Sequence, residues 1–169
     1  MSEKCECVNV RKVVIVGCGF VGSASAFALM QSGLFSEMVL IDVDKDRAEG
    51  EAMDISHGLS ALGEMNVHAG EISDVADSDI IVISAGVGRK PGETRLDLAK
   101  KNVGIIEGIT KNLMQYYNGG VIMVVFNPVD ILTYVVQKVS GLPTGTVFGT
   151  GAVLDSARFR YLLSQKADV

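Results

Sequence analysis

The strongest constraint on the fold is a regular alternation along the chain between short, continuous apolar runs and longer segments with helical spacing. Continuous apolar runs of strand length are typical of parallel strands that crossover helices bury on both faces. The runs predict six strands, at residues 12–17, 37–42, 66–70, 79–84, 121–126 and 146–149. Six strands with helices between them favour an α/β fold with a doubly wound parallel sheet, which binds ligands at the carboxyl ends of its strands.

The clearest predicted helix spans about residues 94–117. Apolar side chains recur there at steps of three and four residues, at Leu96, Ala99, Val103, Ile106, Leu113 and Tyr117. Charged side chains fall between them, at Asp97, Lys100, Lys101, Glu107 and Lys111. This spacing predicts one face packed against the sheet and the other in solvent.

The charge and cysteine content of the chain restrict its partners and its location. A net charge of −5 without a run of Lys or Arg disfavours nucleic acid or an anionic membrane, so small molecules are the expected ligands. Cys5 and Cys7 lie in a charged tail and Cys18 in a glycine-rich turn, which makes no disulfide framework and favours a reducing, cytoplasmic location. No second Cys or His pair accompanies Cys5 and Cys7, so no metal site is expected. The longest apolar runs are too short to span a bilayer.

A glycine pattern follows directly on the first apolar run, as Gly17-Cys18-Gly19-Phe20-Val21-Gly22, and precedes a predicted helix of small residues. Gly17 can make the tight turn, Gly19 lets the backbone approach a pyrophosphate, and Gly22 lets the helix pack close to the strand. The helix N-terminus then offers unpaired N–H groups and a partial positive charge to phosphates. The position of the pattern between strand and helix favours a Rossmann-type dinucleotide site over a glycine turn without a ligand.

Asp42 ends the second predicted strand, about 20 residues after Gly22, where an acid can accept hydrogen bonds from both hydroxyls of the adenosine ribose. A carboxylate there repels a 2′-phosphate, and Asp44 adds negative charge before the first arginine, Arg47. The predicted cofactor is therefore NAD rather than NADP. A simple surface aspartate is the alternative reading of Asp42, and methyltransferases that use S-adenosylmethionine and sugar-nucleotide enzymes stay open at this point.

The fourth predicted strand leads into the segment SAGVGRKPGETRLDLAKKN. Its glycines, Gly86, Gly88 and Gly92, indicate flexibility, and Arg89 and Arg95 offer planar cations to a carboxylate or a developing alkoxide. The segment therefore predicts a mobile lid over a substrate. Arginines that only solvate an exposed loop are the simpler alternative.

Together with GCGFVG, FNPVD and LDSARFRYLL, this loop resembles the lactate/malate dehydrogenase family, and within it the NAD-dependent L-lactate dehydrogenases of bacteria. The resemblance covers nearly the whole chain from Lys12 onward. It implies a tail at 1–11, an NAD-binding Rossmann domain at 12–150, and at 151–169 the first helix of a substrate domain of which only the start is present. It also implies hydride transfer between NAD(H) and a small 2-hydroxy or 2-oxo acid, in a homo-oligomer.

The resemblance implies roles for individual residues. Arg95 matches the loop arginine that polarises the substrate carbonyl, and Asn127 matches the asparagine that contacts the substrate oxygen near the nicotinamide. Arg158 matches the arginine that anchors the substrate carboxylate, and Asp155 the acid that orients a catalytic histidine; an intrahelical salt bridge between these two is the alternative. The predicted cofactor-binding residues are Gly17, Gly19, Phe20, Val21, Gly22, Asp42, Ala85, Gly86 and Asn127.

Reduction of a 2-oxo acid requires a proton donor that titrates near neutrality, and histidine is the expected group. Of the two histidines, His57 is predicted to cap a helix C-terminus and His68 to lie beside a weak strand. In the resembling family the catalytic histidine lies in a GEHGD-like segment beyond LDSARFRYLL. These 169 residues are therefore expected to bind NAD weakly and to turn over nothing unaided, and a catalytically silent NAD-binding fragment is an alternative.

Arg89 bears on the choice of substrate. In the resembling family this loop position is typically Gln in lactate enzymes and Arg in malate enzymes, because a second carboxylate needs its own cation. Arg89 thus favours malate, whereas GETRLDLAKKN and SGLPTGTVFGTG resemble the lactate enzymes more. We expect lactate and pyruvate as substrates, with malate as the alternative.

Overall fold

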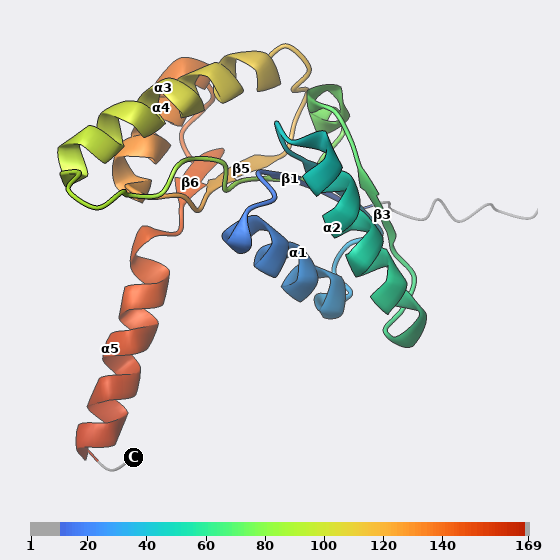
Figure 1. Cartoon of the computed structure of the whole chain (residues 1–169), viewed down its shortest axis with the longest axis horizontal. Coiled ribbons are helices and arrows are strands. Elements are labelled where there is room, and N and C mark those ends of the chain that lie inside the picture. The colour runs from blue at the N-terminus through green and yellow to red at the C-terminus, as the bar shows by residue number, and fades with distance from the viewer. Residues whose placement is uncertain (1–10, 168–169) are drawn as a thin grey trace, which may run out of the picture.

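The computed structural model describes residues 11–167, which form a six-stranded sheet flanked by helices (Figure 1). The strands are β1 (Lys12–Val16), β2 (Glu37–Ile41), β3 (Asn66–Ala69), β4 (Ile80–Ile83), β5 (Val121–Val124) and β6 (Val147–Gly149). All pair in parallel, in the order β3-β2-β1-β4-β5-β6. All six predicted strands are confirmed, each slightly shorter than its apolar run. The predictions for Cys5 and Cys7 lie outside the described residues.

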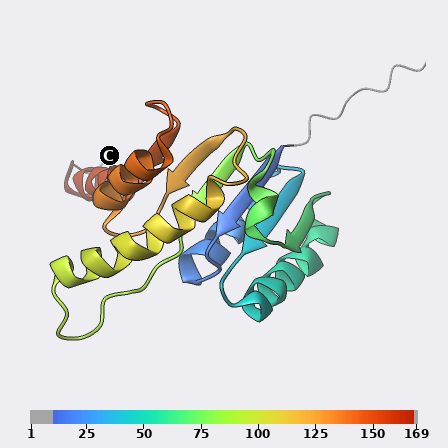
Figure 2. The same ribbon diagram turned by 90° about the horizontal axis from the view of Figure 1, so that it is seen from above.

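Residues 11–167 form five α-helices, four of which lie in two layers, one on each face of the sheet, whereas the fifth projects away (Figure 1). They are α1 (Phe20–Ser32), α2 (Lys45–Gly58), α3 (Arg95–Leu113), α4 (Val129–Ser140) and α5 (Gly151–Ala167), with short 3₁₀ turns η1 (Leu59–Ala61) and η2 (Ile72–Val75). Helices α1 and α2 pack on one face, and α3 and α4 on the other (Figure 2). The strand order reverses between β1 and β4, which is the switch point where doubly wound sheets bind ligands. The predicted fold class is confirmed.

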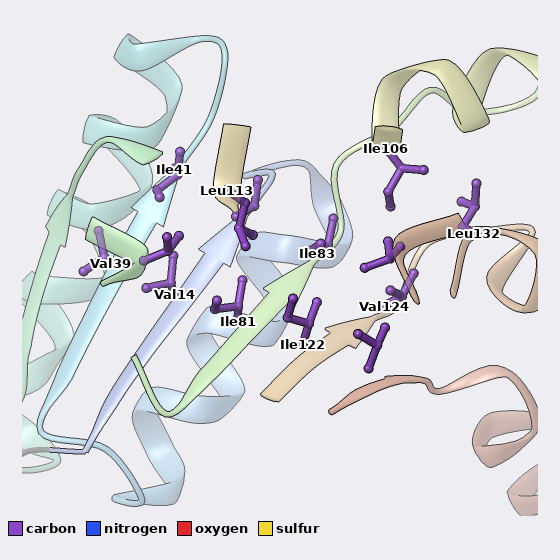
Figure 3. Packing of buried hydrophobic residues seen from close by; sticks show 14 residues of the cluster. Val14, Val39, Ile41, Ile81, Ile83, Ile106, Leu113, Ile122, Val124 and Leu132 are labelled. Atoms are coloured by element: carbon purple, nitrogen blue, oxygen red, sulfur yellow. The ribbon is translucent and has the colours of Figure 1, made fainter. Parts of the chain in front are cut away.

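Each central strand contributes side chains to both layers, because successive residues of a strand point to opposite faces. In β1, Val13 and Ile15 pack with the α1 and α2 layer, whereas Val14 packs with the α3 and α4 layer. Figure 3 shows this second layer, where Ile106 of α3 and Leu132 of α4 approach the strands. Burial on both faces explains why these strands consist of continuous apolar runs.

Helix α3 begins with a capping box, in which the Thr94 hydroxyl accepts the N–H of Asp97 and the Asp97 carboxylate accepts the N–H of Thr94. The predicted inner face is confirmed at Ala99, Ile106 and Leu113, which are buried. The prediction for Leu96 is wrong, because this side chain is 64% exposed. Helix α3 is much longer than the four-residue strands beneath it, so its first turn extends beyond the edge of the sheet (Figure 2).

Helix α5 projects away from the other elements (Figure 1). None of its residues is buried, and its large apolar side chains are half or more exposed, at Val153, Leu154, Phe159, Tyr161, Leu162 and Leu163. The helix that the sequence predicts after residue 151 is therefore present, without extensive packing on the described part of the chain. No helix within residues 11–167 combines the length and hydropathy that crossing a bilayer requires.

Candidate functional site

The turn between β1 and α1 is built around two glycines that the packing requires. Gly17 has a φ of +105°, and a Cβ there would lie 2.5 Å from the backbone nitrogen of Ala85. A Cβ on Gly22 would lie 1.8 Å from the carbonyl oxygen of Gly17. A side chain at Gly17 would therefore push the turn away from the end of β4, and one at Gly22 would separate α1 from the turn.

Gly19 differs from both, because a Cβ there would meet no protein atom within 4 Å, and its φ of −75° suits any residue. The space beside Gly19 is open, so a ligand can reach the backbone. Gly19 lacks a side chain to cap α1 and the first turn of α1 has no acid, which leaves the first N–H groups available to an anion. These features fit a pyrophosphate at this turn. Phe20 and Val21, also predicted here, are exposed.

Asp42 follows β2 and is linked to the glycine turn. Its Oδ2 accepts the N–H of Cys18 at 2.6 Å, and its Oδ1 accepts the N–H of Asp44 at 3.0 Å. An ionised carboxylate has about four acceptor sites, so two backbone bonds leave capacity for ribose hydroxyls. The structure thus places Asp42 beside the turn, as a dinucleotide site requires.

Ser84 also braces this turn, and the sequence reasoning missed it. Its hydroxyl donates to the carbonyl oxygen of Gly17 at 2.7 Å. A Cβ on Gly22 would also lie 2.8 Å from this hydroxyl oxygen. A serine at the end of a strand carries no distinctive sequence signal, because its partner lies far away in the chain.

Cys18 is buried within the turn, with an exposed fraction of 2%. Burial raises the pKa of its thiol to about 12, and the negative charge of Asp42 adds to this effect. The thiol therefore stays neutral at physiological pH and is a weak nucleophile.

The loop between β4 and α3 begins beside the glycine turn. Ala85 contacts the position where Gly17 lacks a side chain, and a Cβ on Gly86 would lie 1.8 Å from the ring of Phe126. Gly86 is therefore required by packing, which differs from the flexibility that we predicted for it. Gly88 has open space around it, and Gly92 has a φ of +84°.

Arg89 and Arg95 are both exposed, and within residues 11–167 neither forms an ion pair with an acid. Arg95 is the first residue of α3, where a cation is unfavourable beside the positive end of the helix dipole. Helix stability therefore does not explain Arg95. Glu93, next to this end of the loop, pairs with Lys101, and this hydrogen bond lowers the pKa of the Glu93 carboxyl.

Asn127 follows β5 and is joined to Pro128 by a cis peptide bond. Its carbonyl oxygen accepts a hydrogen bond of 3.2 Å from the side chain of Asn102, which is fully buried in α3. The sequence reasoning missed Asn102. The available signal was a polar residue on the apolar face of the predicted helix, between Ala99 and Ile106.

Asp155 and Arg158 form an ion pair of 3.1 Å on α5, and both side chains are mostly exposed. This is the intrahelical salt bridge that the sequence left open as an alternative. Within residues 11–167, no hydrogen bond or ion pair links either residue to Arg95 or Asn127. Their roles toward a substrate and a histidine stay predictions.

The two histidines lie along a groove of about 550 Å³ between α2 and β3. His57 is in the last turn of α2, as predicted, and His68 in β3 lies 4.0 Å from a carboxylate oxygen of Glu37. In the described part of the chain, neither imidazole is hydrogen-bonded to the loop arginines or to Asn127. Their positions do not support either as the proton donor for a substrate at the carboxyl end of β5.

Comparison with known proteins connects this geometry to one family. Residues 11–149 match the model for the lactate/malate dehydrogenase, NAD binding domain. The L-lactate dehydrogenase of Thermoanaerobacterium saccharolyticum is 53% identical over 158 residues, which are 94% of this chain and 51% of that protein. The L-lactate dehydrogenase of Priestia megaterium is 54% identical over 161 residues, which are 95% of this chain and 51% of that protein.

Solved structures agree with the sequence relatives. A lactate dehydrogenase from a Medee basin deep-sea metagenome library matches with a TM-score of 0.88 at 47% identity. The minor L-lactate dehydrogenase of Enterococcus mundtii matches with a TM-score of 0.90 at 45% identity. In both cases the match covers 95% of this chain and 51% of the other, so the chain spans about half the length of its relatives. The chain therefore belongs to the lactate/malate dehydrogenase family, and residues 11–149 are its NAD-binding domain.

Proposed function

We propose that this chain forms the NAD-binding half of an L-lactate dehydrogenase-type site, which transfers hydride between NAD(H) and a small 2-hydroxy or 2-oxo acid, with lactate and pyruvate as the pair. The observation that carries the proposal is the identity of 53% and 54% to proteins named L-lactate dehydrogenase, over 94% and 95% of this chain. We further propose an NAD domain at 12–150 and, at 151–169, the first helix of a substrate domain.

In this proposal the glycine turn and Asp42 hold the cofactor. Backbone N–H groups at the start of α1 bind the pyrophosphate beside Gly19, and the Asp42 carboxylate accepts hydrogen bonds from the ribose hydroxyls. Phe20, Val21, Ala85 and Gly86 line the path of the cofactor between these points. When bound, NADH supplies the hydride.

The substrate lies at the carboxyl ends of β4 and β5. Arg95 polarises the substrate carbonyl when the loop closes, because a guanidinium stabilises the charge that develops on its oxygen. Asn127 contacts the same oxygen, and Arg158 binds the substrate carboxylate through two parallel hydrogen bonds. Asp155 orients the histidine that delivers the proton. Neither His57 nor His68 is placed for that proton transfer, so the donor in this proposal comes from outside the residues described here.

A malate dehydrogenase is the second candidate, and Arg89 favours it. This guanidinium is exposed on the loop and has no acid partner within residues 11–167, so it is available to a second substrate carboxylate. We also propose a cytoplasmic location and a homo-oligomeric assembly. The free, buried Cys18 supports the cytoplasmic location. The exposed apolar side chains of α5 support the homo-oligomer, because an exposed apolar surface favours contact with another protein surface.

The cofactor half of the proposal is tested on the 169-residue chain by titrating NADH and following its fluorescence. Saturable binding that NAD competes for is the expected result. Weak affinity is expected, because the chain spans about half the length of its relatives. Absence of binding at millimolar NADH, by a chain that circular dichroism shows to be folded, would contradict the proposal.

The substrate half is tested with a chimera in which residues 1–169 replace the matching half of the Thermoanaerobacterium saccharolyticum enzyme. We expect NADH oxidation with pyruvate, and a loss of about 10²-fold or more in kcat when Arg95→Gln removes the charge that stabilises the alkoxide. Arg89→Gln separates the two substrates. A parent chimera that prefers pyruvate to oxaloacetate supports lactate as the substrate, and one that prefers oxaloacetate assigns malate instead. In either case Arg89→Gln should shift the preference toward pyruvate, because the cation available to a second carboxylate is gone.

A further inference from the structure

The side chain of Asn102 connects two segments of the site. It is fully buried in α3. Its Oδ1 accepts the N–H of Val87 at 3.1 Å, and its Nδ2 donates to the carbonyl oxygens of Val87 and Asn127 at 3.2 Å each. One carboxamide thus holds both the start of the loop that carries Arg89 and Asn127, in the segment between β5 and α4.

Asn102 does little for α3 itself. Asparagine is unfavourable inside a helix, and a buried amide costs free energy unless its polar atoms are paired. All three partners of Asn102 lie outside α3. Thr110, another fully buried polar residue of α3, instead donates to the carbonyl oxygen of Ile106 in its own helix. The bonds of Asn102 therefore fix the relative positions of separate segments.

The loop is held near both ends, with the exposed residues 88–92 between them, of which Lys90 donates its N–H to the Glu93 carboxylate and accepts the N–H of Glu93. Val87 is fixed by Asn102 at one end, and at the other end Glu93 pairs with Lys101 and Thr94 caps α3. Residues 88–92 between these points are all exposed, and a Cβ on Gly88 or Gly92 would meet no atom within 4 Å. This stretch contains Arg89.

We infer that Asn102 is a positioning residue. It fixes Val87 as the pivot about which the loop moves, and it keeps Val87 at a constant position relative to Asn127. Motion of residues 88–92 then brings Arg89 to a substrate without displacing Asn127. The inference rests on the proposed function only for the substrate roles of Arg89 and Asn127. The pivot itself concerns the loop, and it is measurable in the 169-residue chain without a ligand.

The test compares Asn102→Ala, Asn102→Asp and the control Thr110→Val. Asn102→Asp keeps the shape and the acceptor for Val87 but loses both donors, whereas Thr110→Val removes a buried hydroxyl that does not reach the loop. The readouts are the rate of native-state tryptic cleavage after Arg89 and hydrogen exchange of the Val87 amide. Cleavage in a folded loop requires the segment around the cleaved bond to open locally, so its rate reports how firmly the neighbouring Val87 is held.

We expect both Asn102 variants to speed cleavage after Arg89 by about tenfold or more, because buried polar groups lose their partners. Asn102→Ala should also speed exchange at Val87, whereas Thr110→Val should change cleavage by less than about twofold, because its hydrogen bond lies within α3. Equal rates in Asn102→Asp and Thr110→Val would overturn the inference. NADH binding by the parent chain is a separate readout: its failure contradicts the proposed function, whereas normal binding with an unchanged loop contradicts only the pivot.

Discussion

The Oδ2 atom of Asp42 lies 2.6 Å from the backbone nitrogen of Cys18, so the acid at the end of β2 accepts a hydrogen bond from the middle of the glycine turn. The other oxygen of Asp42 accepts the N–H of Asp44. The same carboxylate that we assign to the ribose therefore also shapes the turn that we assign to the pyrophosphate. A change at Asp42 should affect both parts of the cofactor site.

Asp42→Asn tests this double role. A carboxamide can accept only one of the two N–H groups through its oxygen, and its NH₂ group then faces the other donor, so we expect a loss of about 1–3 kcal/mol in the free energy of unfolding. We expect the Kd for NADH to rise about tenfold, whereas that for NADPH should rise less because a repulsive charge is gone. Urea unfolding and fluorescence titration with both cofactors measure these effects.

The control for this variant is Asp46→Asn, which removes the same charge from an exposed position in the first turn of α2. It should leave the ratio of NADH to NADPH affinity unchanged. An equal shift of that ratio in both variants would mean that general electrostatics, rather than the contact at Asp42, sets the cofactor preference.

Gly19→Ala separates binding from folding. The new methyl group meets no protein atom and the backbone angles suit alanine, so the melting temperature should stay close to that of the parent. The methyl group occupies the open space beside the start of α1, so we expect NADH affinity to fall by about tenfold or more, equivalent to about 1.4 kcal/mol. Calorimetric melting and NADH titration give the two quantities.

Gly104→Ala is the matched control, because this glycine of α3 also has open space where a Cβ would lie. Alanine favours the helix there, so the variant should gain about 0.5–1 kcal/mol in stability and bind NADH like the parent. If Gly19→Ala also binds NADH like the parent, the pyrophosphate does not lie at this turn.

The sequence was sufficient for features that depend on local pattern. The strands could be predicted because burial on both faces requires continuous apolar residues, as in β1 and β4. The glycine turn could be predicted because its strand and helix are adjacent in the chain. These features carry the fold and the position of the cofactor site.

Features that depend on distant partners could not be predicted. Ser84 donates to Gly17, and Asn102 holds Val87 and Asn127, all across wide gaps in sequence. Leu96 has the spacing of a buried residue, but its exposure depends on where the sheet ends beneath α3. In each case three-dimensional packing, rather than residue type, decides the outcome.

Thr94→Ala tests the start of α3, which places Arg95. The variant loses the hydroxyl that accepts the N–H of Asp97, so we expect stability to fall by about 1 kcal/mol. Thr94→Ser keeps a hydroxyl at this position, so its free energy of unfolding should differ from that of the parent by about 0.5 kcal/mol at most. Urea denaturation followed by circular dichroism compares the three proteins, and equal losses in both variants would show that the hydroxyl does not cap the helix.

Cys18 should resist alkylation in the folded chain, because burial raises the pKa of its thiol to about 12 and the thiolate is the reactive form. Because folding raises this pKa, the neutral thiol contributes to the free energy of unfolding. That contribution is complete below the ordinary thiol pKa of 9.0 and is lost as the pH rises toward the pKa of about 12 in the folded chain. Iodoacetamide at pH 8, followed by mass spectrometry of the tryptic peptide that begins at Val13, should show unmodified Cys18 in the native chain and full modification in urea. Rapid native modification at pH 8, in a chain whose circular dichroism is unchanged, would contradict the buried position of this thiol in the turn.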